Sequence, residues 1–170
     1  MSGTPQQEWV LEAVARFERP LVSYAASLIG DVDRARDVVQ ETFLRLLKQG
    51  SLQDEHLAPW LFRVCRNLSV DVMRKERRMT SIDNADPAVT ATAEIVELRK
   101  DTNTVLRVLD RLPKNQQEVL RLKFLHELSY KEISEVTDLS ISNVGYLIHV
   151  GLKAIRERLA AAPRTVEKSR

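Results

Sequence analysis

The most informative stretch of the sequence reads Leu128-Ser129-Tyr130-Lys131-Glu132-Ile133-Ser134-Glu135-Val136-Thr137-Asp138-Leu139-Ser140-Ile141-Ser142-Asn143-Val144. Ser129 followed three residues later by Glu132 is a capping box, which sets the start of a helix. Ile133 and Val136 give that helix a buried edge. A turn at residues 138–140 then leads into a second helix. The pattern predicts a helix-turn-helix, whose second helix commonly lies in the DNA major groove.

The second helix has two chemically different faces. At ~100° per residue, one face gathers apolar residues and glycine: Val144, Ile148, Gly151, Leu152, Ile155 and Leu159. The opposite face carries groups that can hydrogen-bond, stack or pair with phosphate. A solvated hairpin face is the alternative, but Tyr146 and Val150 are poor choices for solvation alone. The candidate DNA-reading residues here are Lys131, Ser140, Ser142, Asn143, Tyr146, His149 and Lys153.

The rest of the chain also repeats apolar residues at helical spacing. They recur every three or four residues over 10–28, 35–47, 60–72 and 105–124. Gly30 and Gly50 suit helix ends, and Pro59 suits the first turn of the third helix. Period-two alternation is too short anywhere to need a strand. The predicted fold class is all-α: two small helical domains joined by a flexible linker, the C-terminal one a helix-turn-helix.

A change in composition sets the expected domain boundaries. Residues 1–78 form the first expected domain, and residues 105–162 form the second. Between them, residues 79–104 are polar and poor in large apolar side chains, which predicts a linker. Either a plain tether or a helical start near Ala93 is compatible with this segment. Residues 163–170 are expected to be a tail.

Composition excludes several classes of protein. Among 170 residues there is one cysteine, Cys65, so a disulfide framework or a multi-cysteine metal site is excluded. His56, His126 and His149 lie in different segments without ligand-spaced partners, and no glycine-rich phosphate loop is present. We therefore expect no catalytic residues, no metal and no cofactor. The sequence has neither a signal-peptide layout nor a membrane-length apolar run, so we expect no membrane insertion and a cytoplasmic location.

A local basic cluster stands out against a net charge of only +2. Between positions 63 and 78 there are six basic and two acidic side chains, a local charge of +4. Such a cluster suits backbone phosphates, and its binding to DNA should weaken steeply with salt. For a single residue of this cluster a solvated helix end is the alternative; for the cluster as a whole that alternative is weaker.

Three segments together resemble a bacterial protein family. Residues 37–45 (DVVQETFLR), residues 60–67 (WLFRVCRN) followed by Asp71 and the basic run, and residues 112–120 (LPKNQQEVL) with 128–133 (LSYKEI) occur in a characteristic order and spacing. The chain is similar to the extracytoplasmic-function sigma factors of RNA polymerase over about residues 10–78 and 105–160. The resemblance implies a non-catalytic subunit that docks on core RNA polymerase and reads the minus-ten and minus-thirty-five elements of promoter DNA.

The resemblance also implies roles for individual residues. The helix around residues 38–47 would bind core polymerase, with Phe43 and Val39 better interpreted as core. Its polymerase-binding residues would be Asp37, Gln40, Glu41, Leu44 and Arg45. Residues 67–71 would form a loop that holds a flipped-out minus-ten base, since an asparagine amide offers both a donor and an acceptor. The minus-ten set is Arg63, Arg66, Asn67, Asp71, Arg74, Lys75, Arg77 and Arg78.

Departures from the family pattern and two rival functions remain. Arg36 stands where the family often has an acid, and Gly145, Leu147 and Val150 replace residues that are often basic or small and polar. A helix-turn-helix regulator that is not a polymerase subunit is the main alternative, and a helical interaction protein is the second. Members of the family are commonly held by an anti-sigma factor, a further partner that the residues themselves leave open.

Overall fold

The computed structural model describes residues 4–50, 52–80 and 104–161, and all regular structure within them is helical. The predicted all-α class is thereby confirmed. The helices are α1 (Pro5–Ile29), α2 (Val32–Gln49), α3 (Asp54–Thr80), α5 (Thr104–Leu109), α6 (Lys114–Phe124), α7 (Tyr130–Thr137) and α8 (Ile141–Ala161). None of the helices within these ranges is both long and apolar enough to cross a membrane.

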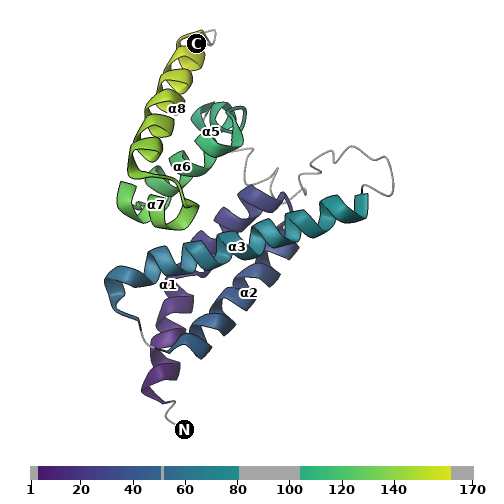
Figure 1. Cartoon of the computed structure of the whole chain (residues 1–170), viewed down its shortest axis with the longest axis vertical. Helices are drawn as coiled ribbons and strands as arrows, with labels where there is room; N and C mark the ends of the chain where they lie inside the picture. The colour runs from purple at the N-terminus through teal and green to yellow at the C-terminus, as the bar shows by residue number, and fades with distance from the viewer. Residues whose placement is uncertain (1–3, 51, 81–103, 162–170) are drawn as a thin grey trace, which may run out of the picture.

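Helices α1, α2 and α3 form the first block, with α1 packed against both of the others (Figure 1). Gly30 ends α1 with φ 81°, a left-handed conformation that glycine adopts at little cost. Asp31 then caps α2, its carboxylate accepting hydrogen bonds from the backbone N–H groups of Asp33 and Arg34. This tight connection makes α1 and α2 antiparallel, so their apolar stripes share one core with α3.

The start of α3 differs from the sequence expectation. The helix begins at Asp54, so Pro59 lies inside it rather than in its first turn. Proline removes one N–H and leaves the carbonyl of Glu55 without its intrahelical partner. Because Glu55 is exposed, water can take the place of that hydrogen bond. The helix also continues to Thr80, two residues past the expected domain boundary; residues 81–103 and 162–170 lie outside the described residues.

The second block contains the predicted helix-turn-helix. Ser129 and Glu132 form the expected capping box of α7, with each side chain bonded to the other residue's backbone N–H. Asp138 follows α7 with φ 59°, a left-handed conformation that aspartate tolerates better than most residues. Ser140 then caps α8, its Oγ accepting from Asn143 N at 3.1 Å. Local sequence chemistry therefore accounts for both helix starts and the turn.

The two blocks pack against each other through α3 and α7 (Figure 1). Buried hydrophobic side chains of both blocks join in a single cluster. Phe62 of α3 and Tyr24 of α1, both almost fully buried, lie on the first block's side of the junction. The described residues thus place the part of α3 that carries Arg63 and Arg66 beside the second block.

Candidate nucleic-acid interface

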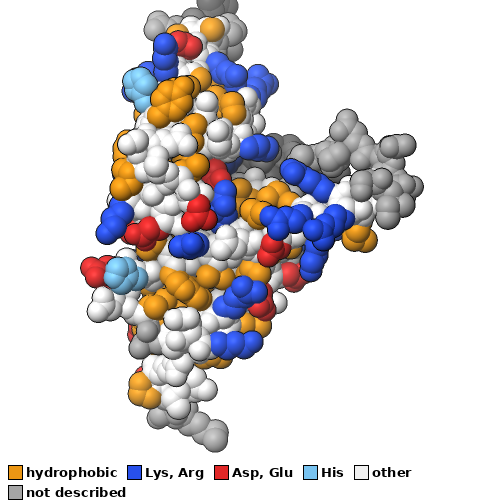
Figure 2. Space-filling view, viewed as in Figure 1, with side chains coloured by type: hydrophobic (Ala, Val, Ile, Leu, Met, Phe, Trp, Pro, Cys, Tyr) orange, Lys and Arg blue, Asp and Glu red, His pale blue; other side chains and the backbone are white. Residues whose placement is uncertain are grey.

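The predicted minus-ten residues all lie on α3. Most recur at steps of three or four residues, so they share one side of the helix. All are exposed except Arg66, which is partly buried. Figure 2 shows basic side chains gathered over the carboxyl-terminal part of α3. This face can hold the phosphates of a nucleic-acid backbone.

The expected base-holding loop at residues 67–71 is wrong, because α3 runs through this segment without a break. No glycine or proline lies between residues 60 and 80 to interrupt it. The hydroxyl of the buried Ser69 also donates a hydrogen bond to the backbone carbonyl of Cys65, one turn earlier in the helix, at 2.8 Å. Asn67 is neither in a loop nor at a helix end; it is exposed on the helix surface.

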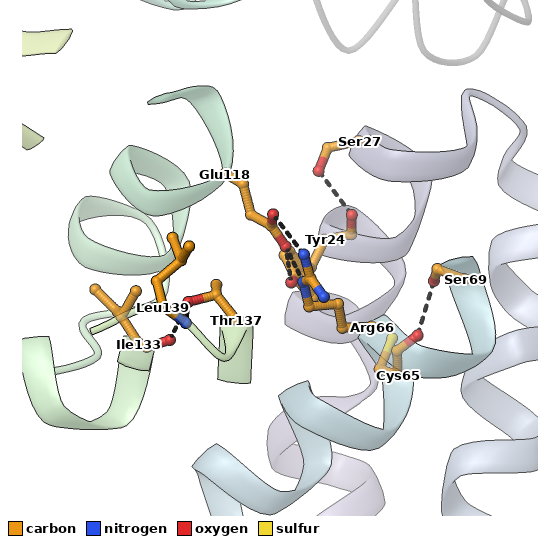
Figure 3. Close-up of polar contacts among 9 residues, drawn as sticks. All are labelled: Tyr24, Ser27, Cys65, Arg66, Ser69, Glu118, Ile133, Thr137 and Leu139. Atoms are coloured by element: carbon orange, nitrogen blue, oxygen red, sulfur yellow. Dashed lines mark hydrogen bonds and ion pairs between the residues drawn. The ribbon is translucent and has the colours of Figure 1, made fainter. Parts of the chain in front are cut away.

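Arg66 is bound by the second block instead of facing solvent. Its Nε and Nη2 donate to the two carboxylate oxygens of Glu118 on α6, at 2.7 and 3.3 Å (Figure 3). The hydroxyl of Tyr24 donates to the same carboxylate at 2.7 Å. Burial would lower the pKa of Arg66, but the hydrogen bond and charge of Glu118 outweigh it and raise that pKa. One of the arginines predicted for the minus-ten set, Arg66, is therefore held in a bidentate ion pair.

Two further contacts join the blocks next to this ion pair. Arg63 of α3 donates to the carboxylate of Asp138, in the turn of the helix-turn-helix, at 3.5 Å. The ring of His126 lies 4.9 Å from that of Phe62 and 5.9 Å from that of Tyr24, measured between centroids. Burial, with the charge of nearby Arg121, lowers the pKa of His126 to about 4, so the ring between the blocks is neutral at pH 7.

The predicted minus-thirty-five residues are all exposed on the second block, and those on α8 lie on the outward face that the helical wheel predicts. Tyr146 is the most conspicuous, with 63% of its surface accessible. The oxygen of Ser140 is already used in the cap of α8, which leaves its hydroxyl hydrogen for a ligand. Residues 141–152 of α8 include no Asp, Glu, Lys or Arg, and Lys153 is the first of these residue types along the helix.

The predicted polymerase-binding residues lie together on the outer side of α2. Asp37, Gln40, Leu44 and Arg45 are exposed, and Glu41 is partly buried and bonded to Arg45 at 3.0 Å. Val39 is buried at 3% exposure, as its core interpretation requires, and Phe43 is partly buried. Leu44 has 52% of its surface accessible and offers apolar area beside these polar side chains.

This face borders a groove of about 1170 Å³. Helices α1 and α2 form most of its walls, and residues of the α5–α6 segment contribute the rest. Its apolar lining includes Val14, Val22, Phe43, Leu44, Leu106 and Leu125. Because both blocks line the groove, a helix seated in it would contact both of them.

Sequence reasoning missed the residues that join the blocks: Tyr24, Glu118, His126 and Asp138. Glu118 lies inside a motif that resembles the minus-thirty-five domain, but no local sequence pattern predicts that it binds Arg66, which is 52 residues away. Cys65 is buried, and burial raises its pKa to about 12. Within the described ranges, no three His, Cys, Asp or Glu side chains gather where they could hold a metal ion.

Comparison with known families matches each block separately. Residues 13–79 match the family described as Sigma-70 region 2. Residues 102–155 match the family described as Sigma-70, region 4. The first block is thus similar to one conserved sigma region, and the helix-turn-helix block to another.

Whole-chain relatives agree with these matches. The chain is 32% identical over 139 residues to the ECF RNA polymerase sigma factor SigM of Bacillus subtilis (strain 168), covering 78% of this chain and 83% of that protein. It is 35% identical over 136 residues to EcfG of Rhodopseudomonas palustris (strain TIE-1), covering 73% and 70%. The sigma factor RpoE of Bartonella quintana, solved in complex with the anti-sigma factor NepR, shares the fold with a TM-score of 0.67 at 20% identity, covering 89% of this chain and 97% of that one.

Proposed function

Because this chain belongs to the extracytoplasmic-function sigma factors of bacterial RNA polymerase, we propose that its two helical blocks divide promoter recognition between them. The family's function is promoter-specific initiation of transcription. The observation that carries the proposal is the match to both sigma regions, in order, along one chain. Residues 1–78 would bind core polymerase and the minus-ten element, and residues 105–162 the minus-thirty-five element, in the cytoplasm and with no catalytic step by this chain.

The outer side of α2 is the proposed polymerase contact. Asp37, Gln40, Glu41 and Arg45 would supply hydrogen bonds and charge, and Leu44 would supply apolar area. Exposure of Leu44 supports this assignment, because burying an exposed leucine against a partner removes apolar surface from water and stabilises the complex. Arg36 stands close by in sequence, where the family often has an acid, and would alter the electrostatics of that contact.

The basic side of α3 is the proposed minus-ten surface. Arg74, Lys75, Arg77 and Arg78 would contact backbone phosphates, which fixes position without reading sequence. Asn67 would read a base edge from the helix surface, since its amide offers a donor and an acceptor. Arg63 and Arg66 would add phosphate contacts once their carboxylate partners are displaced.

The outward side of α8 is the proposed minus-thirty-five reader. Asparagine pairs with the N6 and N7 atoms of adenine in the major groove, whereas guanine is read mainly by Arg or Lys. Asn143 would therefore contact adenine, and Tyr146 would pack against a thymine methyl group. Lys131 and Lys153 would hold flanking phosphates. We therefore expect A·T pairs rather than G·C pairs at the minus-thirty-five positions that the first turns of α8 contact.

An anti-sigma factor is the proposed third partner. The relative RpoE was solved with such a protein, NepR. The groove between α1 and α2 supports the same kind of partner here, because its apolar lining suits the apolar side of an amphipathic helix. A helix in the groove would contact Gln40 and Leu44 and so compete with core polymerase.

Transcription in vitro with purified core polymerase over a promoter library tests the proposal. The wild-type chain is expected to direct initiation from a defined set of sites. With Asn67→Ala, transcription should depend less on the identity of a minus-ten base. With Tyr146→Ala, it should depend less on the identity of a minus-thirty-five base. Asn115→Ala is the matched control, an exposed asparagine outside both proposed readers. The proposal fails if core polymerase selects the same start sites with and without the wild-type chain.

A further inference from the structure

Two carboxylates of the second block accept hydrogen bonds from arginines of the proposed minus-ten surface, so these guanidinium groups are not available to DNA. Glu118 accepts two hydrogen bonds from Arg66, and Asp138 accepts one from Arg63. A carboxylate and a phosphate present similar paired oxygens to a guanidinium, and either can accept its bidentate hydrogen bonds. In this arrangement the two carboxylates stand where phosphate oxygens would bind.

Two side chains of the first block, Tyr24 and Arg66, bind the carboxylate of Glu118 (Figure 3). Tyr24, with none of its surface accessible, donates its hydroxyl to Glu118 Oε1, the atom that Arg66 Nε also contacts. The side chain of Glu118 is only 11% exposed and that of Arg66 25%. Beside them, the rings of Phe62 and His126 pack across the two blocks. The Arg66–Glu118 ion pair is therefore partly buried, and its carboxylate is shared with Tyr24. The Arg63–Asp138 pair, with side chains 51% and 69% exposed, is a surface pair and contributes less.

This packing of the blocks is incompatible with reading both promoter elements at once. At 3.4 Å per base pair, elements centred ~25 base pairs apart are separated by about 85 Å along the duplex. Here Arg63 of the minus-ten surface lies 3.5 Å from Asp138, three residues before α8 begins. Helix α8 itself has 21 residues and a length of about 31 Å. The blocks must separate before both can engage their elements.

We propose that the free chain is autoinhibited by this junction, in which Glu118, positioned by Tyr24 and supported by Asp138, takes the place of promoter phosphates on Arg66 and Arg63. Separation of the blocks, which reading both promoter elements requires, breaks both ion pairs and releases the two arginines to DNA. The inference rests on the proposed minus-ten role of Arg63 and Arg66.

The test measures the affinity of the free full-length chain for a labelled promoter fragment by fluorescence anisotropy. Glu118→Gln keeps the shape of the side chain and removes its charge; we expect it to bind the fragment about tenfold more tightly, the effect of losing one charge-assisted hydrogen-bonded pair. Tyr24→Phe keeps the ring and removes the hydroxyl, with an expected gain of about threefold. Glu12→Gln, an exposed residue of α1, changes net charge equally and should stay within about twofold of the wild type.

Small-angle X-ray scattering of the same proteins supplies the second readout. The wild type should scatter as one compact particle, and Glu118→Gln should have a larger radius of gyration. Equal affinities of Glu118→Gln and Glu12→Gln for the fragment would overturn the proposal, as would a wild type with separated blocks. If Glu118→Gln fails to fold by circular dichroism, Tyr24→Phe decides by the same criteria. Transcription with wild-type protein and core polymerase tests the proposed function separately, because it does not depend on the affinity of the free chain.

Discussion

The packing of α8 on α6 can be tested with two glycines of the same helix. A Cβ atom at Gly151 would lie 2.7 Å from Leu120 Cδ1, closer than carbon atoms can approach. Leu120 is 2% exposed, so its side chain can move only into other packed atoms. A Cβ at Gly145 would lie 3.5 Å from the ring of Tyr130, an ordinary contact. The same substitution therefore meets an obstacle at one position and none at the other.

The magnitudes follow from these distances. Replacing glycine by alanine inside a helix stabilises it by about 1 kcal/mol at either site. Overpacking at Gly151 costs about 1–3 kcal/mol, so Gly151→Ala should lower the free energy of unfolding by roughly 0–2 kcal/mol. Gly145→Ala should raise it by about 1 kcal/mol. Between the two variants we expect a difference of about 1–3 kcal/mol, which corresponds to a shift in Tm of about 2–4 °C for each kcal/mol in a chain of 170 residues.

Urea unfolding of the full chain, followed by far-ultraviolet circular dichroism, measures this difference. Both variants carry the same added methyl group in α8, so helix propensity cancels in the comparison and the packing cost remains. If Gly151→Ala proves as stable as Gly145→Ala, α6 and α8 do not approach each other as described, and the positioning of α8 by Leu120 is wrong.

Three further outcomes follow from single residues. Ser140→Ala removes the acceptor for Asn143 N and should cost about 1 kcal/mol in urea unfolding, whereas Ser140→Asp, which keeps an acceptor, should cost much less. Burial lowers the pKa of His126 from 6.5 to about 4, so protonation of this ring favours the unfolded chain. The free energy of unfolding should therefore be undiminished by His126 above pH 6.5 and fall by up to about 3 kcal/mol as the pH falls towards 4. A pH series of unfolding curves checks this, and His126→Phe should flatten the pH dependence. Cys65, with its pKa raised from 9.0 to about 12, should carry about a thousandfold less thiolate than in the unfolded chain, so alkylation followed by mass spectrometry should label it only in denaturant.

Family resemblance and local chemistry gave opposite predictions at one place, and local chemistry was right. The resemblance implied a loop at residues 67–71, but that segment has no helix-breaking residue and Ser69 bonds back within the helix. At Pro59 the local rule gave the wrong position, because it placed this proline in the first turn of α3 and the helix begins at Asp54. A proline is only favoured, not required, in a first turn, and the exposed Glu55 makes its missing hydrogen bond inexpensive. Local rules predict a helix well and its first residue less well.

The sequence by itself determined the helical class, the helix-turn-helix and the exposed faces of α2, α3 and α8. These depend on residues three or four apart, which contact each other in any helix whatever the rest of the chain does. Only the tertiary structure decided that Arg66 binds Glu118, 52 residues away, and that both blocks line one groove. An arginine on a helix surface can pair with any carboxylate that packing brings within reach. Which one it meets is settled by the docking of whole helices, and no local spacing encodes that choice.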